Sequence, residues 1–211
     1  MKSKSRFAPS PTGELHIGGA RTALFAWLYS KSYKGQCLLR LEDTDKERSE
    51  QKYIDSIVGS FEWLGIVFDG KPFYQSKNKN RHLKKARELL ANDKAYYCEC
   101  SLERLNQLRE EQQKRGIKPK YDEKCRELNL NETSNSVIRF KNPKKGKVSF
   151  KDIVRGEIEV SNEELDDLII VKRDGSPTYN LSVVVDDIDM KITHVIRGDD
   201  HLSNTPRQIN I

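Results

Sequence analysis

Residues 6–21, near the N-terminus, combine side chains and backbone groups that can bind a phosphate. The proline-rich turn Pro9–Gly13 leads to a histidine, His16, and then to two adjacent glycines, Gly18 and Gly19. If a helix begins here, its first amides have no partner within the helix and attract anions, while the glycines let the backbone approach a phosphate closely. The histidine can donate to a phosphoryl oxygen as charge develops. The pattern suits a phosphate site, and a loop that caps a helix with His16 merely exposed explains it equally well.

A second chemical signal comes from three cysteines that lie within one 28-residue stretch, at Cys98, Cys100 and Cys125. Two close thiolates and a distant third predict a tetrahedral zinc site with a structural role, provided that a fourth ligand exists. Tyr121, Glu127 or a water are the candidates for that position, and loss of the metal is the alternative. The fourth cysteine, Cys37, lies in a predicted buried strand and is interpreted as a core residue.

Alternating strands and helices are expected to position the first signal. The hydrophobic periods predict strands over 5–8 and 37–41 and helices over 18–34, 53–64 and 82–91, with Gly35 stopping the first helix. This order predicts an α/β fold with a Rossmann-like unit and crossover connections.

After Lys94 the character of the chain changes. A polar helix is predicted over 102–114, followed by short strands over 137–140, 148–150, 158–160 and 168–171, which is typical of an α+β insertion. The α/β pattern resumes at Val183, with a strand over 194–197 and a helix from about Asn204. We therefore expect three segments, 1–94, 95–182 and 183–211, and because the chain stops as its last helix begins, we expect a piece of a longer protein.

The composition excludes a membrane protein. Hydrophobic residues make up 36% of the 211 and charged residues 33%, and the longest apolar runs are far too short to span a bilayer. No secretory signal is present at the start, so we expect a cytoplasmic location. The net charge of +6 and the pI of about 9.0 suit a partner that carries phosphates, although a lysine-rich solvated surface explains them equally well.

The string RFAPSPTGELHIGGAR over 6–21 closely resembles the HIGH signature block of class I aminoacyl-tRNA synthetases, in the form found in glutamyl-tRNA synthetases. The resemblance continues over essentially the whole chain. Further blocks similar to that family are LRLEDTD over 39–45, SPTYN over 176–180 with VVVDD over 183–187, HVIRGDDH over 194–201, and NTPRQ over 204–208.

The resemblance implies a Rossmann-like catalytic domain, interrupted by an acceptor-binding insertion, in a monomeric ligase that joins L-glutamate to tRNAGlu with ATP and Mg²⁺. It implies that His16, Gly18 and Gly19 hold ATP, with His16 and Gly18 in the catalytic step, and that Asp200 and His201 lie near the ribose and adenine. It also implies a glutamate pocket lined by Arg6, Ala8, Ser10, Glu42, Tyr179 and Arg197.

The chemistry of these side chains suits a substrate with two carboxylates and one ammonium. Arg6 and Arg197 are suitable bidentate partners of carboxylates, Tyr179 is a neutral donor, and Glu42 can pair with the ammonium. Each also has an ordinary structural interpretation, such as a core tyrosine or a structural ion pair. Asp43 and Asp45 are expected to shape a loop and cap a helix rather than to contact substrate.

Two departures from the family limit what the resemblance implies. Related synthetases carry a zinc knuckle in the insertion, often with a histidine where this chain has Glu127. The second signature, KMSKS, is expected well after the last block, so MKSKS over 1–5 is interpreted as a basic N-terminal tail, and the true loop and the anticodon-binding domain are absent from these 211 residues. We therefore expect this chain alone to be inactive or very weak.

Three rival readings remain. A glutamyl-queuosine tRNA synthetase-like paralogue normally departs from the form of residues 16–21, and a glutaminyl enzyme usually has a different turn and a second histidine there. A catalytically inactive RNA-binding module is the rival of another class, because the leaving-group loop is missing.

Overall fold

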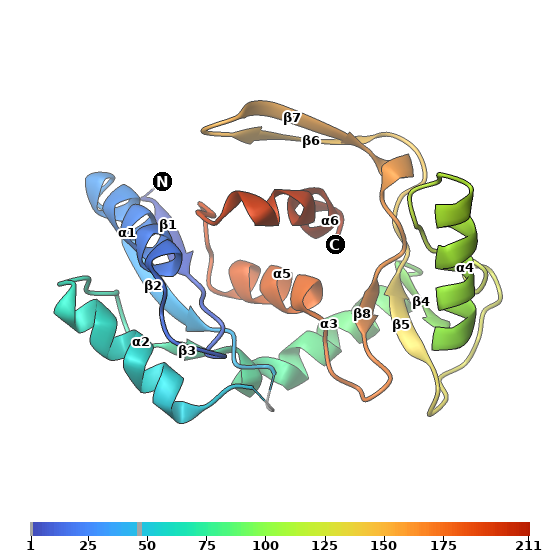
Figure 1. Ribbon diagram of the computed structural model, residues 1–211, viewed down its shortest axis with the longest axis horizontal. Coiled ribbons are helices and arrows are strands. Elements are labelled where there is room, and N and C mark those ends of the chain that lie inside the picture. Colours follow the sequence, from blue (N-terminus) through green and yellow to red (C-terminus); the bar gives the residue numbers. More distant parts are fainter. Residues whose placement is uncertain (1, 46–47) are drawn as a thin grey trace. The chain divides into compact units, whose positions relative to one another are not determined.

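The computed structural model describes residues 2–45 and 48–211 and has an α/β fold (Figure 1). It divides into two compact units. The first unit is formed by the chain up to Lys79 together with Val185–Leu202, and the second by Asn80–Val184 together with Ser203–Ile211. These limits differ from the three predicted segments, because the helix before Lys94 and the last helix of the chain both group with the second unit.

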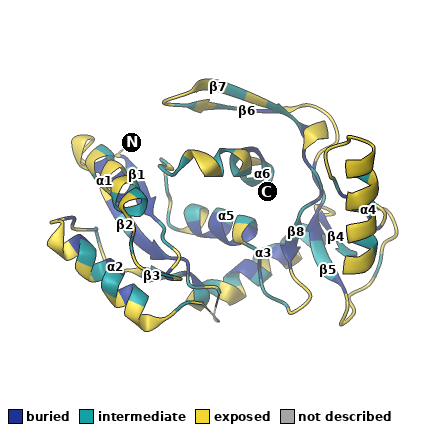
Figure 2. Cartoon of the chain, viewed as in Figure 1, coloured by how far each residue is buried: buried dark blue, intermediate teal, exposed yellow. Residues whose placement is uncertain are grey.

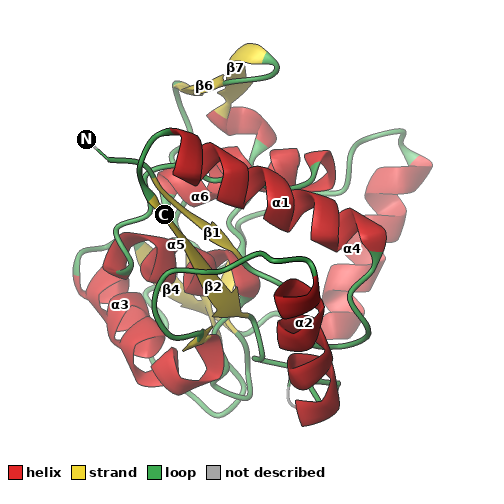
Figure 3. Cartoon of the chain, turned by 90° about the vertical axis from the view of Figure 1, so that its left-hand side faces the viewer, coloured by secondary structure: helices red, strands yellow, loops and turns green. Residues whose placement is uncertain are grey.

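The first unit contains a parallel three-stranded sheet in the order β1-β2-β3. Its elements are β1 (Lys4–Phe7), α1 (Ile17–Ser32), β2 (Gln36–Leu41), α2 (Gln51–Trp63), β3 (Phe73–Tyr74) and the 3₁₀ helix η1 (Gln75–Asn78). Figure 3 shows α1 and α2 in front of β1 and β2. The predicted strand–helix–strand–helix order is therefore confirmed, with bounds that shift by no more than two residues.

The two faces of this sheet differ in chemistry because successive side chains of a strand point to opposite sides. Phe7, Leu39 and Leu41 pack with Ala23 of α1 and with Ile57 of α2 in one hydrophobic core. Burial of this kind contributes about 25 cal/mol for each Å² of apolar surface removed from water. The intervening residues of the same strands, described below, carry charge on the other face.

The end of α1 shows why Gly35 is a glycine. The left-handed residue that terminates the helix is Lys34, with φ 50°, and not Gly35 as the usual pattern would suggest. The amide of Gly35 donates to the carbonyl of Ser30 at 2.7 Å. A Cβ atom on Gly35 would lie 2.0 Å from the carbonyl oxygen of Ser3, so close approach of two backbones excludes any side chain here.

The second unit is built on antiparallel strands. It contains α3 (Lys79–Ala91), β4 (Ala95–Cys98), α4 (Leu102–Lys114), β5 (Val137–Phe140), β6 (Lys147–Asp152), β7 (Gly156–Ser161), the 3₁₀ helix η2 (Asn162–Glu164), β8 (Ile169–Val171) and α6 (Thr205–Asn210). One sheet has the order β4-β5-β8, and β6 pairs with β7 in a hairpin. Figure 2 shows α4 exposed along most of its surface, which explains its polar sequence.

One element near the C-terminus differs from the prediction. Val183, where the α/β pattern was expected to resume, lies in the helix α5 (Tyr179–Asp189). The predicted strand over 194–197 is an irregular segment, although the amides of Thr193 and His194 both donate to the carbonyl of Lys4 beside β1. A 3₁₀ helix, η3 (Asp199–Asn204), then precedes α6.

The N-terminal tail is also more ordered than predicted. Met1 lies outside the described residues, but Ser3 is buried and Lys4 and Ser5 belong to β1. The tail interpretation is therefore wrong for Ser3–Ser5. Among residues 2–45 and 48–211, no helix is both long enough and apolar enough to cross a membrane.

Candidate functional site

Arg6 and Arg40 occupy the charged face of the sheet in the first unit. Arg6 is 3% exposed and donates through Nε to Oδ1 of Asp187 at 3.0 Å and through Nη2 to Oδ2 at 3.4 Å. Arg40 is fully buried and donates through Nη1 to the same Oδ1 at 2.5 Å and through Nη2 to Glu42 at 3.2 Å. Two guanidinium groups and two carboxylates thus form one buried network, which we call the Arg6 network.

The burial of this network makes its charge balance necessary. Burial opposes charge on Arg40, but the ion pairs with Asp187 and Glu42 outweigh it and raise its pKa. Burial raises the pKa of Glu42, against the opposing effect of Arg40 and Arg6. A buried charge left without its partner typically costs about 3–5 kcal/mol, so each member depends on the others.

The loop after β2 holds two further carboxylates in structural roles. Asp43 accepts hydrogen bonds from the amide and the hydroxyl of Ser76 at 2.7 and 2.6 Å, which caps η1. Asp45 accepts from the amide of Arg48 at 3.3 Å and from its Nε at 2.7 Å. These contacts agree with the prediction that both residues shape the loop.

His16 is exposed and forms the N-cap of α1. Its Nδ1 accepts from the amides of Gly18 and Gly19 at 3.1 and 3.4 Å. The predicted phosphate-facing amides therefore already donate to the imidazole. Because both amides are donors, Nδ1 carries no proton and Nε2 is the N–H of the neutral ring. A Cβ atom on Gly18 would lie 3.0 Å from the ring, which explains the need for a residue without a side chain there.

The other predicted ATP residues lie in η3 of the same unit. Asp200 and His201 are consecutive, with 3.6 Å between Oδ2 and Nε2, and the Asp200 side chain is 79% exposed. A Cβ atom on Gly198 would lie 2.3 Å from Oδ1 of Asp200, so the exposed Asp200 side chain would have to move to accommodate a larger residue there.

The remaining predicted glutamate-pocket residues lie at separate places in the chain. Ala8 is half-buried and Ser10 is exposed, both in the loop that follows β1. Arg197 is half-buried in the irregular segment before η3. Tyr179 is 36% exposed at the start of α5, in the second unit. Two of the six predicted residues, Arg6 and Glu42, belong to the Arg6 network. They do not contact each other through a hydrogen bond given above but are linked through Asp187 and Arg40.

The cysteines of the second unit come together as predicted. Sγ atoms of Cys98, Cys100 and Cys125 all lie within 4.8 Å of one another. Cys100 and Cys125 are 3.5 Å apart, close to the separation of about 3.8 Å that two thiolates 2.3 Å from one tetrahedral zinc would have. Burial raises the pKa of Cys100 to about 11, and a metal ion would reverse this by deprotonating its ligands.

The two candidates for the fourth ligand are placed differently. The hydroxyl of Tyr121 lies 3.3 Å from Sγ of Cys98 and 3.6 Å from Sγ of Cys100, and the side chain is buried. Glu127 has a 73% exposed side chain, with its oxygens 3.6 Å from Arg126 and Lys141. Tyr121 therefore faces the sulphurs, whereas Glu127 pairs with cations at the surface.

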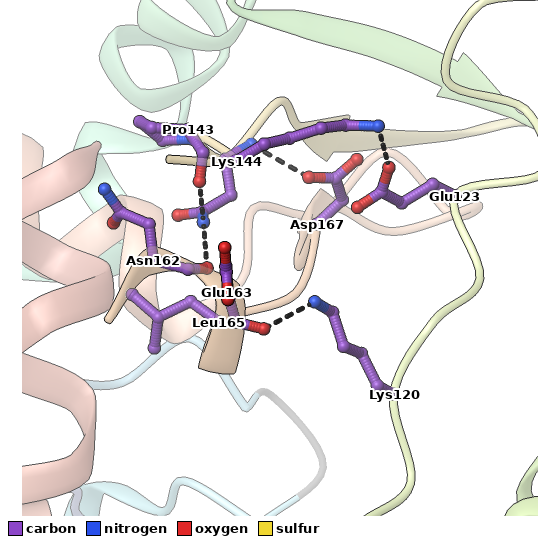
Figure 4. Close-up of a pocket in the computed structure, with 9 residues that line it drawn as sticks. Lys120, Glu123, Pro143, Lys144, Asn162, Glu163, Leu165 and Asp167 are labelled. Carbon is purple, nitrogen blue, oxygen red and sulfur yellow. Dashed lines mark hydrogen bonds and ion pairs between the residues drawn. The ribbon is translucent and has the colours of Figure 1, made fainter. Parts of the chain in front are cut away.

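The second unit also has a polar pocket, and Asn142, Asn162 and Asp167 line its buried side (Figure 4). Its volume is about 250 Å³. Nδ2 of Asn210 in α6 donates to the Oδ1 atoms of both asparagines at 2.8 Å, and Lys120 donates to the Glu163 carbonyl at 2.8 Å. None of the predicted site residues lines this pocket, and the hydrogen bonds named here serve the fold.

Asp187 and Arg40 are the site residues whose roles the sequence did not reveal. Both belong to sequence blocks that carried the family resemblance. The sequence alone does not show which oppositely charged residue each of them contacts in the fold. The alternation of β2 is the usable signal: Arg40 lies between two core leucines, so its charge must be buried or must face an opposite charge.

Comparison with known families shows which class of protein contains this parallel α/β unit with its histidine-capped helix. Residues 2–211 match the model of the class I tRNA synthetases (E and Q), catalytic domain, and the chain belongs to this family. It is 57% identical over 209 residues to a glutamate–tRNA ligase of Francisella tularensis subsp. novicida, and 57% identical over 212 residues to one of Legionella pneumophila.

Solved structures give the same result. The fold resembles a glutamate tRNA ligase from Elizabethkingia meningosepticum, crystallised in complex with its amino acid, with a TM-score of 0.89 and 36% identity over 99% of this chain. A glutamate-tRNA synthetase from Elizabethkingia anophelis matches with the same score and identity. The chain spans about half the length of these relatives, 45% of the Francisella protein and 46% of the first structure.

Proposed function

We propose that the whole protein carrying this chain is a glutamate–tRNA ligase. In the first step an oxygen of the glutamate α-carboxylate attacks the α-phosphorus of ATP, and pyrophosphate leaves. In the second step the terminal ribose hydroxyl of tRNAGlu attacks the carbonyl carbon of the adenylate, and AMP leaves. The observation that carries this proposal is the 57% identity to glutamate–tRNA ligases over 98% of the chain.

The first unit would be the Rossmann-like part that binds ATP with its Mg²⁺. His16 supports this role, because its ring is oriented by two amides and its Nε2 proton is available to a phosphoryl oxygen. Gly18 and Gly19 carry no side chains that would crowd the first turn of the helix beside the phosphate. Asp200 and His201 would contact the ribose and adenine. Positioning and stabilisation of charge suffice for both steps, so no protein nucleophile is required.

The glutamate pocket would combine Arg6, Ala8, Ser10, Glu42, Tyr179 and Arg197. An arginine-lined pocket selects against glutamine, because the neutral amide turns its N–H donors toward the donors of the guanidinium groups. The buried position of Arg6 supports this selectivity, since a desolvated guanidinium discriminates more strongly than an exposed one.

The insertion would bind the tRNA acceptor stem and hold a structural Zn²⁺ ion. Cys98, Cys100, Cys125 and Tyr121 fit such an ion, since three sulphurs and one hydroxyl already converge. When bound, the ion would crosslink β4 to the loop that carries Cys125. We further propose a monomeric, cytoplasmic enzyme.

An aminoacylation assay tests the function. The whole protein is given labelled glutamate or glutamine with tRNAGlu, with tRNAGln and with queuosine-bearing tRNA, and we expect glutamate on tRNAGlu. Charging with glutamine, or transfer of glutamate to queuosine alone, would overturn the proposal. His16→Asn is the matched variant, because asparagine still caps the helix but lacks the ring N–H, and we expect kcat to fall about a hundred- to a thousandfold.

A further inference from the structure

The guanidinium of Arg6 offers two edges to carboxylates, and only one of them is occupied. A guanidinium binds a carboxylate bidentately either side-on, through Nε and one Nη, or end-on, through both Nη atoms. Asp187 takes the side-on edge, with contacts of 3.0 Å from Nε and 3.4 Å from Nη2. Nη1 of Arg6 makes no hydrogen bond within residues 2–45 and 48–211, so the end-on edge remains for a ligand.

Asp187 is itself fixed in place. Its Oδ1 also accepts from Nη1 of Arg40 at 2.5 Å, and Arg40 is fully buried and bridges to Glu42 at 3.2 Å. The Asp187 side chain is 18% exposed. Because Arg40 uses both Nη atoms on protein carboxylates, it is not a ligand for substrate, and its role is to hold Asp187.

We propose that Asp187 is a positioning residue that aims the end-on edge of Arg6 at a carboxylate of the substrate. This inference rests on the proposed function, in which Arg6 lines the glutamate pocket. A bidentate carboxylate contact requires a fixed plane of the guanidinium, and a displacement of about 1 Å typically costs about a hundredfold in rate. Asp187 supplies that plane without contacting the substrate.

The neighbouring carboxylate provides a control within the same helix. Asp186 is fully buried and accepts from Nε2 of Gln75 and from Nδ2 of Asn78, both at 2.7 Å. These two amides are neutral and tie α5 to η1. Replacement of Asp186 is therefore expected to weaken the packing of α5, whereas replacement of Asp187 also releases the guanidinium of Arg6.

The test compares Asp187→Asn with Asp186→Asn in the whole protein. Glutamate binding is measured by calorimetry, KM for glutamate and for ATP by aminoacylation, and stability by thermal unfolding. We expect Asp187→Asn to raise the Kd and KM for glutamate roughly ten- to a hundredfold, with KM for ATP within about twofold. Asp186→Asn is expected to lower the unfolding temperature with KM for glutamate within about twofold.

The outcomes separate this inference from the proposed function. Absence of glutamate binding by the wild-type protein overturns both. Normal wild-type binding, with the glutamate KM of Asp187→Asn unchanged or shifted no more than that of Asp186→Asn, overturns the inference alone. If Asp187→Asn does not fold, Asp187→Glu replaces it, because it keeps the charge but moves the carboxylate by one methylene, and the same shift in KM is expected.

Discussion

The Arg6 network and the cysteine cluster both collect reactive side chains, but they differ in how their charge is balanced. In the network, two guanidinium groups meet two carboxylates, so the protein supplies each charge with its counterion. In the cluster, three thiols and a tyrosine hydroxyl converge. Two arginines lie beside them: Arg104 contacts Cys100, and Arg139 lies over the Tyr121 ring. The charges of the first site are balanced before a ligand arrives, whereas the second would be completed by the proposed metal cation.

Replacing one ligand of the cluster should have the largest effect. In Cys125→Ser we expect the zinc content to fall from about one ion per chain to none, because two thiolates and one hydroxyl hold the ion too weakly. Structural zinc typically contributes about 10–16 kcal/mol of apparent binding energy at pH 7, so the second unit should lose its cooperative unfolding transition. Metal analysis and thermal unfolding measure both effects. Cys37→Ala is the control, since that buried thiol lies in the first unit, and loss of zinc there would contradict the assignment.

Breaking the network should have the next largest effect. Arg40→Met leaves Asp187 and Glu42 with less compensation in a buried site, and we expect a loss of about 3–5 kcal/mol in the free energy of unfolding. Urea denaturation measures it. In the double variant Arg40→Met/Glu42→Gln, part of the loss should be recovered, because one uncompensated carboxylate becomes neutral. Additive losses in the double variant would contradict the coupling.

The choice between Tyr121 and Glu127 sharpens the comparison. Tyr121→Phe removes the hydroxyl that faces Cys98 and leaves the three thiols in place. We expect zinc binding to weaken about 10- to 100-fold, which is the loss typical when a residue that hydrogen-bonds a metal ligand is removed. A chelator competition measures the change. Glu127→Gln should leave the affinity within about twofold, because its side chain is exposed. The reverse order of effects would make Glu127 the fourth ligand.

The smallest expected effect concerns pH. Burial raises the pKa of Asp69, but hydrogen bonds from the amide of Cys37 and from Lys31 outweigh it, so the pKa lies below its usual 3.8. A lowered pKa in the folded state means that the contact stabilises at neutral pH and that this contribution disappears as the pH falls through the folded-state value. Asp69→Asn should therefore flatten the fall in stability below about pH 4, measured by urea denaturation as a function of pH. An unchanged acid profile would contradict this.

The sequence predicts the local elements better than it predicts charge partners. Helix 102–114 and strand 137–140 were predicted with the bounds that the structure shows, because hydrophobic period and polar flanks are local properties. The strand predicted over 194–197 is an irregular segment in the structure, because a short apolar run alone does not determine whether a segment joins a sheet. The partner of Arg6 could not be predicted, because Asp187 is 181 residues away and only the fold brings the two together.

The same contrast holds within the candidate site. The three cysteines were predicted as a group because thiols are few and ligand spacing is characteristic. The choice between Tyr121 and Glu127 depends on which side chain turns inward, and the spacing does not determine that. A similar limit applied to MKSKS, where Lys4 and Ser5 proved to be strand residues.

The capping of α1 by its own histidine has a consequence for ligand binding. The imidazole is held by two amides without a bound nucleotide, so a phosphate at the proposed site would meet a ring whose rotation is already restricted. Ordering a free side chain on binding costs about 0.5–1.5 kcal/mol, and this chain meets that cost when it folds. The affinity of the proposed site for a phosphate would therefore depend on whether the first turn of α1 keeps the backbone conformation that holds the ring.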